Sequence, residues 1–370
     1  MSADYARLRL KYHGDPVRMD EILQAECREK TAKKLPRLLG CADFRFPSLA
    51  VAEMSTSEAA ADYHASLVKP GCTVLDMTAG LGVDAFAMAR KGCHVTAVEI
   101  EPHTAEVLRH NVKALDLDDA VEVVEANSVE WLMDSDRKFD VIFIDPARRD
   151  NTGRHFTLKD CHPDVLKHIE LLTLKCDLLV IKASPMINVG ELNEYGAETS
   201  VVGTTRECKE VLFCLGAGCQ AGRVRCVTLG HGEFVVREGV TQKFGTPLPG
   251  DILFQPYPAV MKGGGTASID NAVKLHPFSH LFFAESVPAD FPGEAYRIVA
   301  IHPFDKRNVK TVATEYPKIN VAVRNFPLSA PELVKRLKVK EGGRMMLFGT
   351  TSHDGAKLLI VADPITNNNA

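Results

Sequence analysis

A glycine-rich turn follows a short apolar segment in VLDMTAGLGVDAFAMA, residues 74–89. Gly80 and Gly82 lack a Cβ atom, so a ligand can lie directly against the backbone where the next helix begins. Asp76 stands at the end of the preceding strand, where its carboxylate can accept hydrogen bonds from a ligand ammonium group or its bound water. The segment predicts a ligand-binding turn, and we include Thr78 of this turn among the contacting residues.

A second carboxylate, Glu99, closes the next predicted strand roughly twenty residues later, where it can accept hydrogen bonds from two ribose hydroxyls. NAD and S-adenosylmethionine (SAM) both satisfy this pattern, because Ala85 is a permitted residue at the third position of Gly-x-Gly-x-x-Gly. Asp76 distinguishes between these two cofactors. Its carboxylate would repel a pyrophosphate and attract the positively charged methionyl end of SAM. The sequence therefore predicts SAM.

Two further strand ends supply polar side chains. Asn127 follows the third predicted strand, where its amide would meet the adenine of the cofactor or cap the next helix, and the two roles are compatible. Asp145 follows the fourth strand. Ligands of open α/β sheets bind beyond the carboxyl ends of the strands, so Asp145 should face both cofactor and acceptor. We expect it to accept a hydrogen bond from an acceptor N–H and to orient that nitrogen.

Arg148 and Arg149 come directly after Asp145, and we predict Arg148 as its catalytic partner. Guanidinium groups bind phosphate through paired hydrogen bonds or stack on a base. The alternative is an ordinary loop surface. The segment 182–186 forms the other lip of the crevice. Neither lip contains the cysteine that carbon methylation of pyrimidines needs, since Cys161 and Cys176 fall outside both, so that route is disfavoured.

Strands and helices alternate from Gly71 onward, which predicts a Rossmann-like α/β core with a parallel sheet. The predicted strands are 73–76, 94–98, 121–124, 139–144 and 177–181, and the predicted helices are 83–90, 101–115, 129–133 and 163–175. A helical lead-in precedes this core, with helices over 19–40 and 58–68. Ser55, Thr56 and Ser57 are candidate N-caps of the second of these helices.

A stretch rich in Gly and Pro, residues 237–251, marks a boundary. Beyond it the order strand, helix, strand, helix, strand, strand resembles a small ferredoxin-like α+β module, and Ser329 with Glu332 has the spacing of a capping box. The predicted domains are a helical region over residues 1–68, a methyltransferase-like core over 69–240 and a C-terminal α+β domain over 241–370.

The composition is that of a soluble protein, with 45% hydrophobic and 25% charged residues and a net charge of −4. We expect a cytoplasmic protein, since no secretory signal or membrane-length apolar segment is visible. Residues 297–344 nevertheless hold eleven Lys and Arg against four Asp and Glu, which favours either a polyanion partner or a solvated basic face. The ten cysteines form no Cys-x-x-Cys pair, so no metal site is expected. The cluster Cys208, Cys214, Cys219 and Cys226 is left open.

With these residues in view, the chain resembles bacterial class I SAM-dependent methyltransferases that end in a THUMP-like domain and are regarded as RNA methyltransferases. The similarity covers nearly the whole length, and these segments carry it: KKLP (33–36), TSEAAADY (56–63), DMTAGLGVD (76–84), VE (98–99), DPARR (145–149), KASPM (182–186), HPFSHLF (276–282) and RNFPLS (324–329). The resemblance implies a C-terminal RNA-binding module. It also implies that TSEAAADY folds over the cofactor, which adds Ser57 and Glu58 to the cofactor-binding residues.

One position departs from the pattern of enzymes that methylate amino groups of nucleic acids. Those enzymes have Asp or Asn, Pro, Pro and then an aromatic residue, whereas this chain has Ala147 and Arg148 in the last two places. The target atom therefore stays open. Our hypothesis is a SAM-dependent methyltransferase that acts on a base of rRNA or tRNA. The alternatives are a small-molecule methyltransferase and a non-catalytic RNA-binding protein with a vestigial SAM pocket. The sequence does not determine the oligomeric state.

Overall fold

The computed structural model describes residues 4–148, 157–287 and 291–365. The chain forms two compact units. The first comprises Met1–Ser200 with Glu210–Arg223, and the second comprises Val201–Lys209 with Val224–Ala370. No helix within the described ranges is long and apolar enough to cross a membrane.

The first unit begins with four helices, α1 Tyr5–Lys11, α2 Pro16–Thr31, α3 Leu49–Met54 and α4 Glu58–Ser66. The predicted helix over 19–40 was wrong at both ends. Helix α2 begins at Pro16, because the Asp15 side chain accepts a hydrogen bond from the Arg18 N–H and proline is well tolerated at the first helical position. It ends at Thr31, ahead of Pro36, whose ring disfavours helix continuation.

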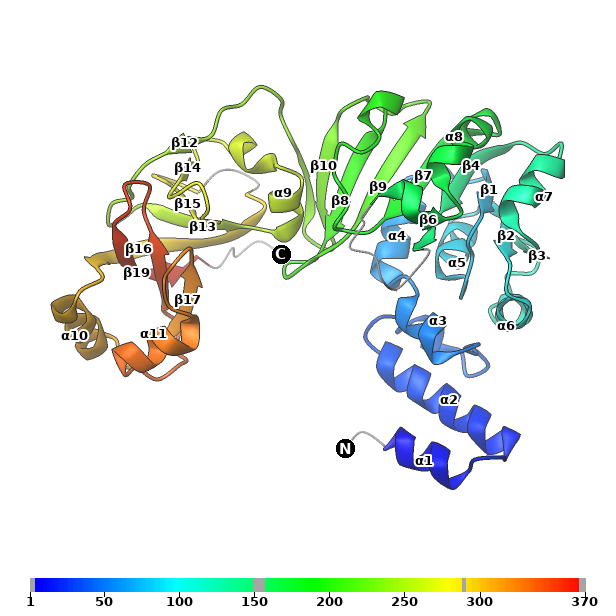
Figure 1. Cartoon of the computed structure of the whole chain (residues 1–370), viewed down its shortest axis with the longest axis horizontal. Coiled ribbons are helices and arrows are strands. Elements are labelled where there is room, and N and C mark those ends of the chain that lie inside the picture. The colour runs from blue at the N-terminus through cyan, green and yellow to red at the C-terminus, as the bar shows by residue number, and fades with distance from the viewer. Residues whose placement is uncertain (1–3, 149–156, 288–290, 366–370) are drawn as a thin grey trace. The chain divides into compact units, whose positions relative to one another are not determined.

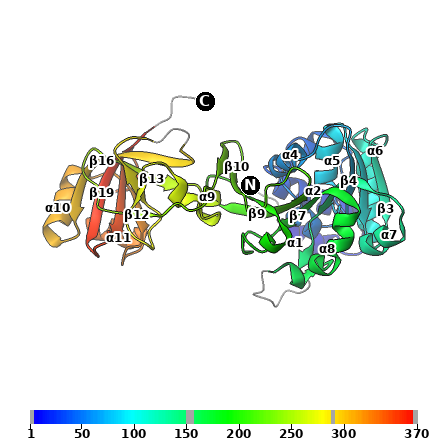
Figure 2. The ribbon, with the colours of Figure 1, turned by 90° about the horizontal axis from the view of Figure 1, so that it is seen from above.

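A parallel sheet follows, and its alternation with helices confirms the predicted α/β class. The strands are β1 Thr73–Asp76, β2 His94–Glu99, β3 Val121–Glu125, β4 Phe139–Ile144 and β7 Cys176–Ala183, in the order β7-β4-β1-β2-β3. The helices are α5 Val83–Arg90, α6 Pro102–Ala114, α7 Ser128–Asp134 and α8 Val165–Leu174. Helices α5 and α6 cover one face of the sheet and α7 and α8 the other (Figures 1 and 2).

The four strands directly after β7 were not predicted, and neither were the four that follow them along the chain. The first four are β8 Glu198–Gly203, β9 Cys208–Gly216, β10 Val224–Thr228 and β11 Gly232–Val235. Strand β9 lies antiparallel beside β7 and is followed in the sheet by β8. Its residues 210–215 are buried without interruption. Such a strand shows no alternation of apolar and polar residues, so its pattern does not distinguish it from a buried helix.

The second unit contains an eight-stranded sheet in the order β12-β14-β15-β13-β16-β19-β18-β17. Its strands are β12 Lys243–Phe244, β13 Ile252–Pro256, β14 Val273–Lys274, β15 Phe282–Ala284, β16 Gly293–Pro303, β17 Asn320–Arg324, β18 Met346–Thr351 and β19 Lys357–Pro364, and its helices are α9 Pro258–Lys262, α10 Lys306–Glu315 and α11 Ala330–Leu337. The predicted capping box of Ser329 and Glu332 is confirmed at the start of α11. Helices α10 and α11 pack through Val312, Leu333 and Leu337 onto the sheet.

Candidate active site

The sheet of the first unit changes its winding direction at β1, whose neighbours are β2 on one side and β4 on the other. In open α/β sheets the ligand crevice lies at such a switch point, outside the carboxyl ends of the strands. Asp76 ends β1 and Asp145 follows β4, so both predicted residues lie at this edge. The backbone N–H of Asp145 donates to Thr78 Oγ1 over 2.8 Å, which ties the loop after β4 to the turn after β1.

The glycine turn has the left-handed backbone that its residues favour, with φ of +53° at Gly80 and +88° at Gly82. Gly82 also has no room for a side chain, because a Cβ atom there would lie 2.4 Å from Leu108 Cδ1. A Cβ at Gly80 would have its nearest neighbour 3.9 Å away, at the Thr78 carbonyl oxygen. Gly82 is therefore needed for packing onto α6, whereas Gly80 leaves space above the turn.

Substitution of Gly82 by Ala should destabilise the first unit by roughly 2–4 kcal/mol, because backbone strain and overpacking both act. Gly71→Ala is the matched control. Its φ is +80° but nothing lies within 4 Å of its Cβ position, so strain alone should cost about 1–2 kcal/mol. Urea unfolding of both variants measures the difference. Equal losses for the two would contradict the assigned packing role.

Asp76 is 1% exposed, and its carboxylate accepts the Thr78 N–H over 3.1 Å. Burial, together with the charge of Asp84, raises the pKa of Asp76 to about 8. An ionised carboxylate is therefore poorly stabilised by the protein's own groups, and a ligand cation would favour it. The site fits the positively charged methionyl end of SAM in this respect.

The other predicted cofactor residues all form hydrogen bonds that shape the crevice. Glu99 accepts the backbone N–H groups of Gly80 over 2.9 Å and of Glu101 over 2.8 Å, and so holds the glycine turn against β2. A carboxylate has about four acceptor positions, so two remain for ribose hydroxyls. Asn127 caps α7 by accepting the N–H groups of Val129 and Glu130, as the alternative interpretation expected. Its contact with adenine stays a prediction.

Ser57 and Glu58 lie at the start of α4. The Ser57 hydroxyl caps this helix by accepting the Ala60 N–H, which confirms the predicted cap. Glu58 is buried and holds the 37–38 segment, since it accepts the N–H groups of Arg37 and Leu38 and a hydrogen bond from the Arg37 guanidinium. These contacts account for both residues structurally. Their role in cofactor binding stays a prediction.

Asp145 pairs with Lys182 of β7, whose Nζ lies 2.5 Å from Asp145 Oδ2. Lys182 also donates to Thr56 Oγ1 over 3.1 Å and lies 3.9 Å from Glu210 Oε2. Burial lowers the pKa of Lys182, but the negative charges of Asp145, Asp84 and Glu210 have the larger effect, so the pKa of Lys182 is raised. The pair joins the two lips of the crevice, and Lys182 was predicted only as part of the second lip.

A buried histidine extends this cluster. His64 Nδ1 lies 2.7 Å from Asp84 Oδ1, and His64 Nε2 lies 2.6 Å from Glu210 Oε1. Burial lowers the pKa of His64, but the two carboxylates prevail and raise it to about 9. The pKa of Asp84 is lowered, because His64, Lys182 and Thr56 together overcome its burial. The His64 imidazolium and the Lys182 ammonium therefore pair with three carboxylates at the crevice, those of Asp84, Asp145 and Glu210.

His64, Asp84 and Glu210 were not predicted from the sequence as functional residues. Two signals were present. Glu210 stands directly before the apolar run 211–215 of β9, at a buried position, and His64 lies in the alanine-rich helix α4. Charged residues at positions that should be buried are usually paired. Strand β9 was not predicted, however, so nothing placed Glu210 near the other two.

Arg148 lies in a short strand, β5 Ala147–Arg148, which pairs with β6 Cys161–His162. The Arg148 side chain and the whole of Arg149 fall outside the described part of the structure, so the predicted phosphate or base contact stays a prediction. The pairing sets Arg148 opposite Cys161, a residue that was predicted to fall outside both lips of the crevice.

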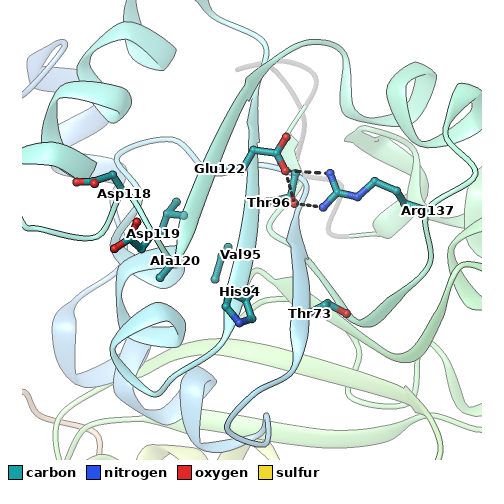
Figure 3. Close-up of a pocket in the computed structure, with 10 residues that line it drawn as sticks. Thr73, His94, Val95, Thr96, Asp118, Asp119, Ala120, Glu122 and Arg137 are labelled. Atoms are coloured by element: carbon teal, nitrogen blue, oxygen red, sulfur yellow. Dashed lines mark hydrogen bonds and ion pairs between the residues drawn. The ribbon is translucent and has the colours of Figure 1, made fainter.

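A separate pocket of about 190 Å³ lies at the other edge of the sheet (Figure 3). Thr73, His94 and Val121 begin their strands there, so it is at the amino ends of β1, β2 and β3. Arg137 closes it by donating to Glu122 over 2.9 Å and to Thr96 over 2.8 Å, as the dashed lines of Figure 3 show. This edge lies opposite the candidate site. Among the described residues, no group of His, Cys, Asp and Glu could hold a metal ion.

Comparisons with known proteins agree with this geometry. A family model described as "Putative SAM-dependent methyltransferase" matches residues 52–155. A ferredoxin-like domain model matches residues 253–292, and a "THUMP domain-like" model matches residues 293–364. The first of these ranges contains the glycine turn, Glu99 and Asp145.

Relatives carry similar names. The ribosomal RNA small subunit methyltransferase J of Coxiella burnetii is 38% identical over 86 residues, which are 21% of this chain and 32% of that enzyme. The chain thus spans about a third of the length of this relative. A Mycobacterium tuberculosis protein named as an uncharacterised S-adenosylmethionine-dependent methyltransferase is 23% identical over 85% of this chain and 87% of its own.

A solved structure covers almost the whole chain. The crystal structure of a "putative methyltransferase from Porphyromonas gingivalis W83" superposes with a TM-score of 0.87 and 27% identity, over 99% of this chain and 95% of that one. Together these matches support the resemblance drawn from the sequence motifs and the assignment of SAM as the cofactor. The chain carries a SAM-dependent methyltransferase domain followed by ferredoxin-like and THUMP-like domains.

Proposed function

We propose that the protein transfers the methyl group of SAM to a base in RNA. The observation that carries the proposal is the hydrogen bond between the loop after β4 and the predicted cofactor turn after β1. In it the Asp145 N–H donates to Thr78 Oγ1. A direct displacement at a sulfonium needs donor and acceptor held in line and in contact. Two loops tied by a hydrogen bond at a switch point would provide this alignment.

The cofactor would lie across the carboxyl ends of β1, β2 and β3. Asp76 would interact with the methionyl end, Glu99 would accept hydrogen bonds from the ribose and Asn127 would approach the adenine. Thr78, Gly80 and Gly82 would form the turn beneath it. SAM supplies an electrophilic methyl group, so the protein's own part is to position the acceptor and to accept its proton.

Asp145 would do both. Its ion pair with Lys182 fixes the orientation of the carboxylate, which can then accept a hydrogen bond from an acceptor N–H and direct the nitrogen lone pair to the methyl carbon. The methyl group of bound SAM would accept the nitrogen lone pair, and the electron pair of the C–S bond would stay on sulfur. The proton released from nitrogen passes to Asp145 or through it to water. Arg148 would hold a neighbouring phosphate or stack on the base.

RNA is the proposed acceptor because of the second unit and the relatives. Five cationic residues are exposed along the helices: Lys306, Arg307 and Lys310 on α10, and Lys335 and Arg336 on α11. Such a surface binds phosphates without sequence preference. The Coxiella relative is named as an rRNA methyltransferase, and the C-terminal family model is THUMP-like. We propose a cytoplasmic location, where rRNA and tRNA are available.

Asp145→Asn should reduce methyl transfer from labelled SAM to RNA by about 100-fold or more, since the carboxylate that accepts the proton is lost. SAM affinity, measured by calorimetry, should change by less than about threefold because Asp145 lies on the acceptor side. Asp140→Asn is the matched control, as Asp140 lies near the start of β4, the strand that Asp145 follows, and accepts hydrogen bonds from Thr73. Label that enters only small metabolites would contradict the proposal.

A further inference from the structure

A second pocket, of about 660 Å³, is lined entirely by residues of the second unit. The residues that line it come from the turn between β8 and β9, the end of β13, helix α9, the start of β16 and the end of β17. None of the residues of the candidate active site contributes to it. Its volume is in the range of pockets that hold a whole small molecule and is larger than a single inorganic anion needs.

Positive charge prevails in the lining. Arg206, Lys262 and Arg324 contribute three cations against the single carboxylate of Glu294. The guanidinium of Arg324 is held in place, because it donates to Gln255 Oε1 over 2.7 Å. Glu294 accepts the Tyr296 hydroxyl over 2.7 Å, which disperses part of its negative charge. The pocket therefore favours an anion, and arginine is well suited to bind phosphate.

His280 also lines the pocket and is affected by the positive charges near it. Burial lowers the pKa of His280, and the charges of Lys274 and Arg324 lower it further. A neutral imidazole in this lining leaves the fixed cations without added repulsion and can donate or accept a hydrogen bond. This supports an anionic ligand, which would offset the positive field.

Another part of the lining is apolar and aromatic. The ring of Tyr257 is half-buried and lies 5.5 Å from the ring of His231, while Pro256, Pro258 and Met261 supply apolar surface. Flat rings stack on tyrosine, and base stacking of this kind contributes about 1–3 kcal/mol. The lining thus combines a cationic part with an aromatic part, and Glu294 offers an acceptor for an amino or hydroxyl group.

We infer that this pocket binds a single nucleotide unit of RNA, with its phosphate at Arg206, Lys262 and Arg324 and its base on Tyr257. The choice of RNA as the source rests on the proposed function, whereas nucleotide binding itself does not. Since the pocket is separate from the candidate active site, a nucleotide bound there would anchor the RNA rather than be methylated.

The test is a calorimetric titration of the full chain, without SAM, with nucleoside monophosphates, the matching nucleosides, inorganic phosphate and a short 5′-phosphorylated RNA. A nucleotide should bind at least about tenfold more tightly than its nucleoside or phosphate alone, and the RNA at least as tightly as the nucleotide. Arg206→Ala and Tyr257→Leu should each weaken binding about tenfold. Arg206 is exposed, so its loss should leave the fold intact.

Lys357→Ala is the control, because Lys357 is an exposed cation of β19 that does not line the pocket, and it should leave nucleotide affinity unchanged. Equal affinity for nucleoside and nucleotide, or for phosphate and nucleotide, would overturn the inference. So would nucleotide binding that survives in Arg206→Ala and Tyr257→Leu. A free nucleotide that binds where RNA does not would overturn RNA as the source. Methyl transfer to RNA is measured separately, so either idea can fail while the other stands.

Discussion

Replacing Asp76 with Asn is expected to weaken SAM binding by about 10- to 100-fold and at the same time to stabilise the fold. Asp76 is almost fully buried, and burial raises its pKa to about 8. Its negative charge therefore interacts strongly with a bound cation but is unfavourable without one. Asn is nearly isosteric and can still accept the Thr78 N–H, so it removes the charge with little change in packing.

The same shift predicts how SAM binding varies with pH. In the free protein Asp76 is largely protonated below about pH 8, and a bound cation favours the ionised form. SAM affinity should therefore rise as the pH increases from about 6 to 8.5, and this rise should vanish in Asp76→Asn. Calorimetry at several pH values, in buffers of different ionisation enthalpy, measures both the affinity and the proton released.

The stability of the free protein should follow the opposite trend. The folded-state pKa of Asp76 is raised above its ordinary value of 3.8, so the folded protein binds the extra proton. Stability falls as the pH rises from about 4 to 8, and Asp76→Asn should remove that decline. At pH 8 we expect Asp76→Asn to raise the free energy of unfolding by roughly 2–4 kcal/mol. Asp140→Asn is the control. An Asp76→Asn protein that binds SAM normally would contradict the assigned role.

His64→Ala should destabilise the first unit by roughly 3–5 kcal/mol, because it leaves Asp84 and Glu210 buried without the cation between them. Both nitrogen atoms of His64 are within hydrogen-bond distance of these carboxylates, at 2.7 Å and 2.6 Å. Urea unfolding measures the loss. Glu210→Gln in the His64→Ala background should recover part of it, since one of the two carboxylates that lose the imidazolium is then neutral. Additive losses in the double variant would contradict direct coupling.

The raised pKa of His64 also predicts a pH range over which the stability of the fold decreases. Its pKa is raised from 6.5 to about 9, so its contribution to stability is complete below pH 6.5 and is lost as the pH rises through 9. The full contribution is about 3 kcal/mol. This range runs from about pH 6.5 to 9, whereas that of Asp76 runs from about pH 4 to 8, so only His64 contributes between about pH 8 and 9. The decline between about pH 8 and 9 should therefore disappear in His64→Ala and persist in Asp76→Asn.

The fold of the core could be predicted because its signals are local. Strand β4 contains the apolar run 141–144, Gly82 directly precedes α5, and Ser329 with Glu332 marks a helix start. Each of these depends on neighbours within a few residues, so the sequence expresses them directly. The end of α2 was missed although Pro36 is a local signal for it, and the strands β8 to β11 were missed because tertiary packing overrides local propensity there.

The candidate site likewise contains residues that the sequence predicts and residues that it does not. Asp76, Glu99 and Asp145 were identified because the carboxyl ends of parallel strands meet at one edge, so position along the chain predicts proximity. The cluster of His64, Asp84 and Glu210 joins α4, α5 and β9, and His64 and Glu210 are 146 positions apart in the sequence. No pattern in a single sequence links positions so far apart, since their approach depends on which strand follows β7 in the sheet.

The most direct test of the central claim is mass spectrometry of nucleosides from the RNA of cells with and without the gene. One methylated nucleoside should disappear with the gene, return when the wild-type chain is supplied, and stay absent when Asp145→Asn is supplied at the same level. Asp140→Asn should restore it. An unchanged set of RNA nucleosides in cells that lack the gene, or full restoration by Asp145→Asn, would contradict RNA methylation at this site.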